Sequence, residues 1–113
     1  MKIVHQNETH EVKNSDNCMV IEYPTLDSEM DFAIAHITGR YPEKNRAVNI
    51  QCKEMVYIHE GQGIVEVEGK HYSLKTGDCV LIEAGEKFFW EGKMTLFISC
   101  RPAFNIEQHQ WVE

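Results

Sequence analysis

Glycines at regular intervals constrain the fold of the second half of this chain more than any other feature of its sequence. After residue 60 they stand in the turn-like contexts 60–63, 68–70, 76–78, 84–86 and 91–93. Glycine tolerates the positive φ angles of tight turns, so each context predicts a chain reversal. The intervening segments are short and rich in β-branched and aromatic residues, as strands are. Closely spaced turns between short strands predict an antiparallel β-sandwich or barrel.

Alternation of apolar and charged residues supports this strand assignment. Val65 and Val67 fall on one face of their segment, whereas Glu66 and Glu68 fall on the other. A strand with one buried and one solvated face has this pattern.

The first half of the chain is less regular. Strands are expected at 18–22 and 32–37, where β-branched residues and alanines follow one another. Residues 39–53 have a polar middle and are expected to form a loop that leads into a strand. The tail at 106–112 is expected to form a helical turn capped by Asn105, because asparagine is a favoured N-cap residue.

The composition is that of a globular protein, with 42% hydrophobic and 26% charged residues. A net charge of -7 disfavours nucleic acids and anionic membranes as partners. No apolar run is long enough to span a bilayer, the N-terminus has no signal-peptide core, and the four cysteines lie far apart. We therefore expect a cytoplasmic protein with reduced thiols. Its single domain would span 1–113, with a barrel core at about 18–101, an N-terminal strand region at 1–17 and a C-terminal tail at 102–113.

Two motifs within residues 54–92 resemble the conserved core of the cupin superfamily. The first places Glu54 ahead of a turn at Gly61, and the second begins with a Gly-Asp pair at Gly77 and continues to a turn at Gly85. The resemblance implies an all-β fold, namely the antiparallel double-stranded β-helix, a jelly-roll or cupin barrel. Further segments are similar to a divergent group of small single-domain cupins that lack the metal-binding histidines, at 39–43, 47–49, 88–92, 100–104 and 107–109. That group has no assigned activity, so the resemblance implies a fold and little function.

Metal-binding cupins hold the metal with two histidines ahead of the glutamate and a third in the second motif. Those family positions fall here on Ala47 or Val48, on Asn49 or Ile50, on Glu54 and on Phe88. Only the glutamate is kept, whereas a transition metal needs about three imidazole or carboxylate ligands. The resemblance therefore implies no bound metal, and we expect no other cofactor. The alternative is a relocated site, in which His36 joins Glu54 and Cys52 or Cys100, although no spacing supports it.

Glu54 is the candidate with the largest chemical consequence. It alternates with Val56 and Ile58, which directs its side chain into the barrel. A carboxylate buried without a metal must be hydrogen-bonded, paired with a cation or protonated. It is therefore either a ligand anchor or general base, or an inert remnant tied to Asn49 or to a tyrosine hydroxyl.

Two aromatic residues and two further side chains complete the candidate site. Phe88 and Trp90 share a strand face and form either an aromatic wall for a ligand or ordinary packing. Cys52 shares the strand parity of Glu54 and can face the lumen. Arg46 can hold an anionic group at the barrel mouth, unless it lies in a solvated loop. One cavity is predicted to unite Asn49, Glu54, Phe88 and Trp90.

Three functions remain open on these residues. The first is a small-molecule-binding cupin of unassigned activity with its ligand in the barrel lumen. The second is an enzyme that uses Glu54, either a metal-free isomerase or epimerase or an oxygenase with displaced ligands. The third is a structural or dimerisation module with a filled lumen. A homodimer is expected in each case, and the strand at 18–22 is the candidate for exchange between subunits.

Overall fold

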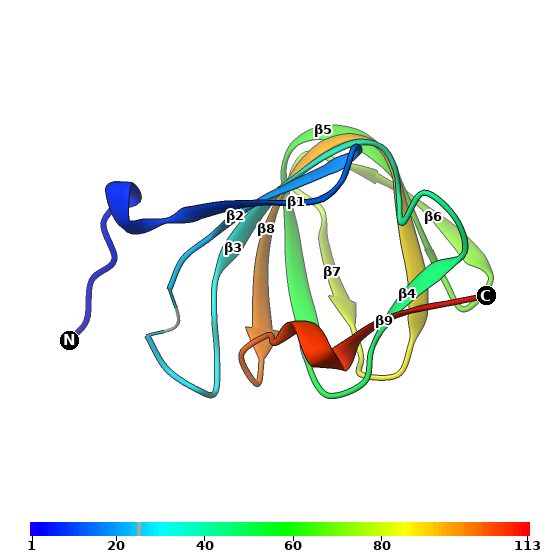
Figure 1. The fold of residues 1–113 in the computed structure, drawn as a ribbon. Coiled ribbons are helices and arrows are strands. Elements are labelled where there is room, and N and C mark those ends of the chain that lie inside the picture. The colour runs from blue at the N-terminus through cyan, green and yellow to red at the C-terminus, as the bar shows by residue number, and fades with distance from the viewer. Residues whose placement is uncertain (25) are drawn as a thin grey trace.

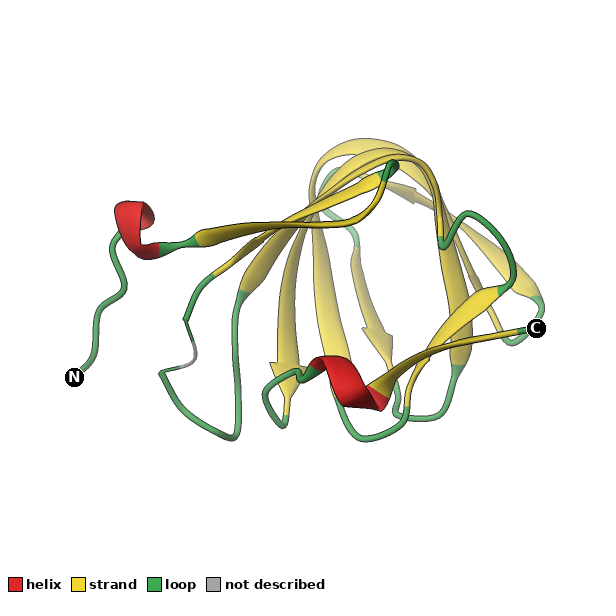
Figure 2. Ribbon diagram, in the orientation of Figure 1, coloured by secondary structure: helices red, strands yellow, loops and turns green. Residues whose placement is uncertain are grey.

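Nine antiparallel strands form one curled sheet in the computed structural model, which describes residues 1–24 and 26–113. Their bounds are β1 (His10–Ser15), β2 (Cys18–Glu22), β3 (Ala33–Tyr41), β4 (Arg46–Asn49), β5 (Lys53–Val67), β6 (Lys70–Lys75), β7 (Cys79–Ile82), β8 (Lys87–Arg101) and β9 (His109–Val112). The helical elements of the described residues are two short 3-10 turns, η1 (Gln6–Glu8) and η2 (Ile106–Gln108) (Figure 2). The sheet curls around an apolar interior (Figure 1), so the expected all-β cupin barrel is confirmed.

The two longest strands, β5 and β8, form the spine of the barrel. They pair from Lys53 opposite Arg101 to Val67 opposite Phe88. β3 follows β8 on its other side, and β6 and β7 pair with the two ends of β5. β4 pairs with both β8 and β9, so the C-terminal strand closes one side of the barrel.

Three of the predicted glycine turns are confirmed and two are wrong. The confirmed turns stand between consecutive strands at Gly69, Gly77 and Gly85. The contexts 60–63 and 91–93 instead lie inside β5 and β8, where Gly63 and Gly92 are opposite each other. A Cβ atom on Gly92 would lie 2.6 Å from the Cα of Gly63. Glycine is therefore required there because two long strands approach closely, and not because the chain reverses.

The strands expected in the first half are present, and the loop expected at 39–53 is confirmed only in part. The segment 18–22 is β2, and 32–37 covers the first part of β3. β3 continues to Tyr41, and the short β4 divides the remaining stretch into two loops, at 42–45 and 50–52, the second of which leads into β5. Gly39 does not break β3 because it pairs with Gly92 on β8, at the same close crossing.

The C-terminal tail follows the prediction only in its first turn. The Asn105 side chain accepts a 3.1 Å hydrogen bond from the backbone N–H of Gln108, so η2 has its expected cap. Residues 109–112 then extend as β9 because β4 offers them a pairing partner. The strand pairing of a distant segment therefore overrides the local helical preference.

Inward-facing side chains of β5 and β8 supply much of the core, including Val56, Ile58, Val65 and Leu96. Glu66 departs from the predicted alternation, because it is buried although Glu68 is exposed. The Nε atom of Arg46 lies 3.1 Å from its carboxylate. This ion pair offsets the desolvation of a carboxylate that has little contact with water.

The strand proposed for exchange between subunits is not a free edge. β2 pairs with β1 on one side and with β3 on the other. β1 therefore takes the outer position on this side of the sheet, and it runs away from the barrel towards the N-terminus (Figure 1).

All four cysteines are free thiols, and three of them are buried as expected, whereas Cys79 is exposed. No helix within the described ranges is long and apolar enough to cross a membrane.

We expect Gly92→Ala to lower the free energy of unfolding more than Gly77→Ala. The φ angles of the two glycines are 139° and 98°, so both substitutions carry a backbone cost of about 1–2 kcal/mol. Only at position 92 would the added methyl meet backbone atoms, since nothing lies within 4 Å of the corresponding point at Gly77. The clash should add about 1–3 kcal/mol. Urea denaturation measures both losses, and equal losses would contradict the close crossing of β5 and β8.

Candidate functional site

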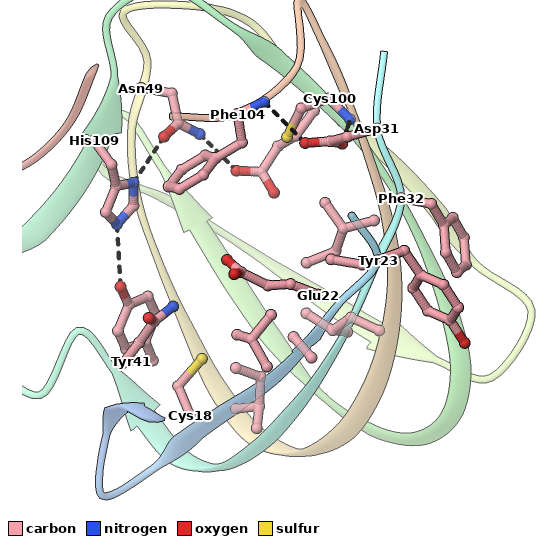
Figure 3. Close-up of a pocket in the computed structure, with 18 of the residues that line it drawn as sticks. Cys18, Glu22, Tyr23, Asp31, Phe32, Tyr41, Asn49, Cys100, Phe104 and His109 are labelled. Carbon is pink, nitrogen blue, oxygen red and sulfur yellow. Dashed lines mark hydrogen bonds between the residues drawn. The ribbon is translucent and has the colours of Figure 1, made fainter. Parts of the chain in front are cut away.

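The barrel interior contains a cavity of ≈ 220 Å³. It is walled by side chains of β1, β2, β3, β5 and β8, together with Asn49 of β4 and residues of the C-terminal tail (Figure 3). The site is therefore a pocket within the barrel.

Glu54 lies on the inner face of β5 and is 6% exposed. The Nδ2 atom of Asn49 donates a 2.8 Å hydrogen bond to its Oε1 atom. Burial raises the pKa of Glu54 to about 7, an effect that the Asn49 bond opposes and the nearby Asp31 charge reinforces. The carboxyl group therefore changes its protonation state near neutrality, as a general acid or base must.

Asn49 is held in turn by the C-terminal tail. Its Oδ1 atom accepts hydrogen bonds from Nε2 of Gln108 at 3.1 Å and from Nδ1 of His109 at 2.7 Å. Burial lowers the pKa of His109, which favours the neutral ring. With its proton on Nδ1, the ring accepts at Nε2, and the hydroxyl of Tyr41 donates to it at 3.0 Å.

Every bond of this network donates towards Glu54, from Tyr41 through His109 and Asn49 (Figure 3). Such a chain polarises the amide and stabilises the ionised carboxylate. An amide is a poor carrier of protons, so the network orients Glu54 and does not relay its proton.

Gln108 fastens the tail to the loop that precedes β5. Its Oε1 atom accepts from the backbone N–H groups of Gln51 and Cys52, at 3.1 and 3.2 Å. The side chain is 1% exposed, so all its hydrogen bonds lie in the interior. The Gln108 side chain therefore holds both Asn49 and the backbone that precedes Glu54.

Aromatic residues form the apolar part of the lining. Phe88 and Trp90 are buried and meet edge to face, with ring centroids 6.3 Å apart. Phe104, from the tail, lies near Asn49 and Asp31 on another side of the cavity (Figure 3). The cavity thus has an aromatic wall beside a hydrogen-bonded polar wall, which suits a ringed ligand with a polar group.

Two more carboxylates line the cavity. Asp31 accepts from the backbone N–H groups of Cys100 at 2.7 Å and Phe104 at 2.8 Å, one to each oxygen. It thereby fixes the start of the tail to the end of β8. Glu22 extends from β2 with its carboxylate turned into the cavity (Figure 3).

The structure brings together the four residues predicted to converge: all of Asn49, Glu54, Phe88 and Trp90 line the cavity. Cys52 is buried but lies outside the lining. Arg46 is also outside it, because its guanidinium pairs with Glu66.

Sequence reasoning missed Glu22, Asp31, Tyr41 and His109 as lining residues. Glu22 carried a signal, because it has the strand parity of the buried Cys18 and Val20. The others come from segments that meet only in the folded chain, so no local pattern marks them.

The donor set does not fit the metal centre of the family. Phe88 is 2% exposed and Ala47 is fully buried, so two ligand positions hold apolar side chains. The described residues contain no group of three or more His, Cys, Asp or Glu side chains placed to hold a metal ion. The relocated site with His36 is wrong, because that side chain bonds Thr95 on the face opposite to the inward-facing Ala35 and Ile37.

Replacement of Glu54 by glutamine is expected to change how stability depends on pH. The pKa is raised from 4.5 to about 7, so the folded state holds this proton more tightly than the unfolded state. The stabilising contribution is complete below the unfolded pKa and is lost as the pH rises through the folded one. Over that interval wild type should lose about 3 kcal/mol relative to Glu54→Gln, which cannot ionise.

Chemical denaturation at about pH 5 and about pH 8 measures this difference. The titratable groups around Glu54 include His10, Cys18, Glu22, Asp31, Tyr41, Cys52, Cys100 and His109. They are present in both proteins, so their own contributions largely cancel. In particular, the lowered pKa of His109 gives a loss of stability on acidification that has the opposite sign. A pH-independent difference would contradict a raised Glu54 pKa.

Gln108→Ala should destabilise the fold and loosen the site. It leaves the N–H groups of Gln51 and Cys52 without their acceptor, and an unsatisfied buried donor such as that of Cys52 costs about 1–3 kcal/mol. Gln110→Ala is the matched control, since Gln110 is an exposed glutamine two residues later, in β9. Thermal unfolding compares the two variants, and equal midpoints would show that Gln108 does not fix the tail.

Comparisons with known proteins agree with this geometry. A family model described as "Cupin domain" matches residues 45–93. Streptomyces Pac13 in a structure with uridine superposes with a TM-score of 0.89 at 15% identity, covering 100% of this chain and 91% of that one. KdgF from Halomonas sp. gives 0.77 at 12% identity, covering 95% and 98%. Ectoine synthase from P. lautus gives 0.75 at 17% identity, covering 100% and 91%. These identities establish a shared fold alone, and comparison with curated proteins gives no match.

Proposed function

We propose that this chain, which shares the fold of cupins, binds a single-ring organic molecule in the barrel lumen, with Glu54 as the polar anchor. The observation that carries this proposal is the cavity itself. One oxygen of a buried carboxylate is held by Asn49, and within the described residues no bond is made to the other oxygen, Oε2. An acceptor that faces the cavity without a protein partner favours a ligand that donates a hydrogen bond to it.

The size of the cavity limits the ligand. Sites for drug-sized molecules occupy about 300–1,000 Å³, whereas an apolar cavity of about 150 Å³ holds benzene. A volume of ≈ 220 Å³ therefore suits one ring with a few substituents. Phe88 and Trp90 supply the face on which such a ring can pack.

One relative of known structure has a ligand with related features. Pac13 is described as a nucleoside dehydratase, and its structures include uridine. A nucleoside combines a flat heterocycle with hydrogen-bond donors, which are the two features that the walls of this cavity complement, and its sugar adds a second ring to the single ring proposed here. Uridine is therefore a suitable first probe for this chain, although the fold alone does not fix the ligand.

Acid–base catalysis is the second candidate function, favoured by the protonation behaviour of Glu54. A carboxyl group with a pKa of about 7 exchanges its proton readily at neutral pH. The network from Tyr41 holds it in one orientation next to the ligand space. An isomerase, epimerase or dehydratase reaction needs such a group beside the carbon that loses or gains a proton.

A homodimer and a cytoplasmic location belong to the same proposal. β1 is the outer strand on one side of the sheet, and unpaired strand edges favour association with a second chain. Neither property changes the assignment of the lumen as the binding site.

Ligand-dependent stabilisation tests the binding function. Uridine and benzyl alcohol should raise the unfolding temperature in proportion to the logarithm of their concentration, because they bind only the folded chain. Glu54→Ala should abolish the uridine shift. Differential scanning fluorimetry gives both results, and native mass spectrometry checks for a molecule that co-purifies.

Glu60→Ala is the matched control, because Glu60 is an exposed glutamate on the same strand. It should leave the ligand-induced shift unchanged. If neither probe shifts the transition and nothing co-purifies, the lumen is a filled structural core and the binding function is refuted.

A further inference from the structure

The cavity lining carries negative charge without a fixed positive charge. Its carboxylates come from three separate segments: Glu22 at the end of β2, Asp31 ahead of β3, and Glu54 on β5. The described residues of the lining include no lysine or arginine, and its only basic side chains are His10 and His109. The ring of His109 is occupied by Asn49 and Tyr41, so it offers no free donor to a ligand.

The three carboxylates differ in how far the protein satisfies them. Asp31 receives a backbone N–H bond at each oxygen. Glu54 receives one bond, from Asn49. Glu22 makes no side-chain hydrogen bond or ion pair with another described residue, although His10 stands opposite it in the β1–β2 register. The acceptor capacity left for a ligand therefore lies on Glu22 and Glu54.

Burial strengthens the electrostatic interaction of these two acceptors with a ligand. Glu54 is 6% exposed, and Glu22 is half-buried with its carboxylate directed into the same space (Figure 3). Water screens charges poorly in such a pocket, so an anion entering it would meet like charges with no cation to balance them. A cation would meet two carboxylates whose free oxygens lack donors.

The aromatic wall favours the same sign of charge. The faces of Trp and Phe rings are negative, and a cation placed over them is attracted by about 0.5–2 kcal/mol. Trp90, Phe88 and Phe104 all line the cavity that holds the carboxylates. Carboxylates beside aromatic rings are the combination that recognises an ammonium group.

We propose that the cavity selects a cationic ligand, a single-ring molecule with an ammonium group that binds in the space lined by Glu22 and Glu54. This inference rests on the proposed function, since it assigns the charge of the ligand in the same lumen. An ammonium group only donates hydrogen bonds, which matches a lining whose free groups are acceptors. Glu22 is the residue that sets this specificity, because its carboxylate is the one left without a protein partner.

Three probes of nearly equal shape separate charge from fit: benzylammonium, benzyl alcohol and benzoate. We expect the full chain near neutral pH to bind benzylammonium at least about tenfold more tightly than benzyl alcohol, and benzoate most weakly. Isothermal titration calorimetry or NMR titration at constant ionic strength measures the three affinities. Benzoate binding as tightly as benzylammonium would overturn the inference.

Two variants test whether Glu22 causes the preference for benzylammonium. Glu22→Gln should weaken benzylammonium about tenfold and change benzyl alcohol by less than about twofold. Glu11→Gln removes the same charge from the exposed surface of β1 and should change neither affinity. If both variants weaken benzylammonium binding equally, the preference for the cation comes from the net charge of the protein. That result would overturn the role of Glu22. The ranking in the wild-type chain does not depend on whether either variant folds.

The outcomes also separate this inference from the function on which it rests. Binding of benzyl alcohol with no preference for the cation would leave the lumen as a ligand site and remove only its charge selectivity. Failure of all three probes and of uridine to bind would overturn both.

Discussion

The long pairing of β5 with β8, which shifts register once between Ile58 and Glu60, is the constraint on which the rest of the structure depends. Glu54 lies near one end of this ladder, opposite Cys100, whereas Phe88 lies at the other end, opposite Val67. They line one cavity only because the ladder curls, so that its two ends face each other across the lumen. The curl needs the close glycine crossing in the middle of both strands, where side chains would hold the backbones apart. Opposite ends of the same pair of strands thus contribute residues to the polar wall and to the aromatic wall of the site.

The buried carboxylate in turn explains why the C-terminal tail packs where it does. Desolvation of Glu54 is unfavourable, and the Asn49 bond offsets only part of it, as the raised pKa indicates. Asn49 donates to Glu54 only while its amide keeps this orientation. Gln108 and His109 fix the orientation by donating hydrogen bonds to the amide oxygen. Pairing of β9 with β4 delivers both side chains to that position. The tail is therefore part of the site as well as part of the fold.

The limits of sequence reasoning follow the same division between local and distant interactions. Alternation along β5 placed Glu54 inside the barrel, and the spacing of Phe88 and Trp90 placed both on the inner face. These are properties of a single strand. The prediction for Gly92 was wrong. A glycine that allows a tight turn and a glycine that allows two strands to approach closely look the same in the sequence. His109 was missed because β4, more than fifty positions earlier, determines its place. Glu22 could have been predicted from the sequence. Alternation along its strand places it on the same face as apolar residues, and therefore on the inside of the barrel.

Phenylalanine at position 88 changes the chemistry that this lumen offers. In the metal-binding pattern, histidines and the glutamate share a cation, which keeps the carboxylate ionised. Here an aromatic ring fills the third histidine position and the glutamate has only an amide as its partner. The carboxyl group is then free to titrate near neutrality and to accept a bond from a ligand. Together with Glu22 and Asp31, the lumen holds three carboxylates and no lysine or arginine among its described lining residues. In the proposal made above, a bound ammonium group would supply the positive charge that a metal supplies in the metal-binding pattern.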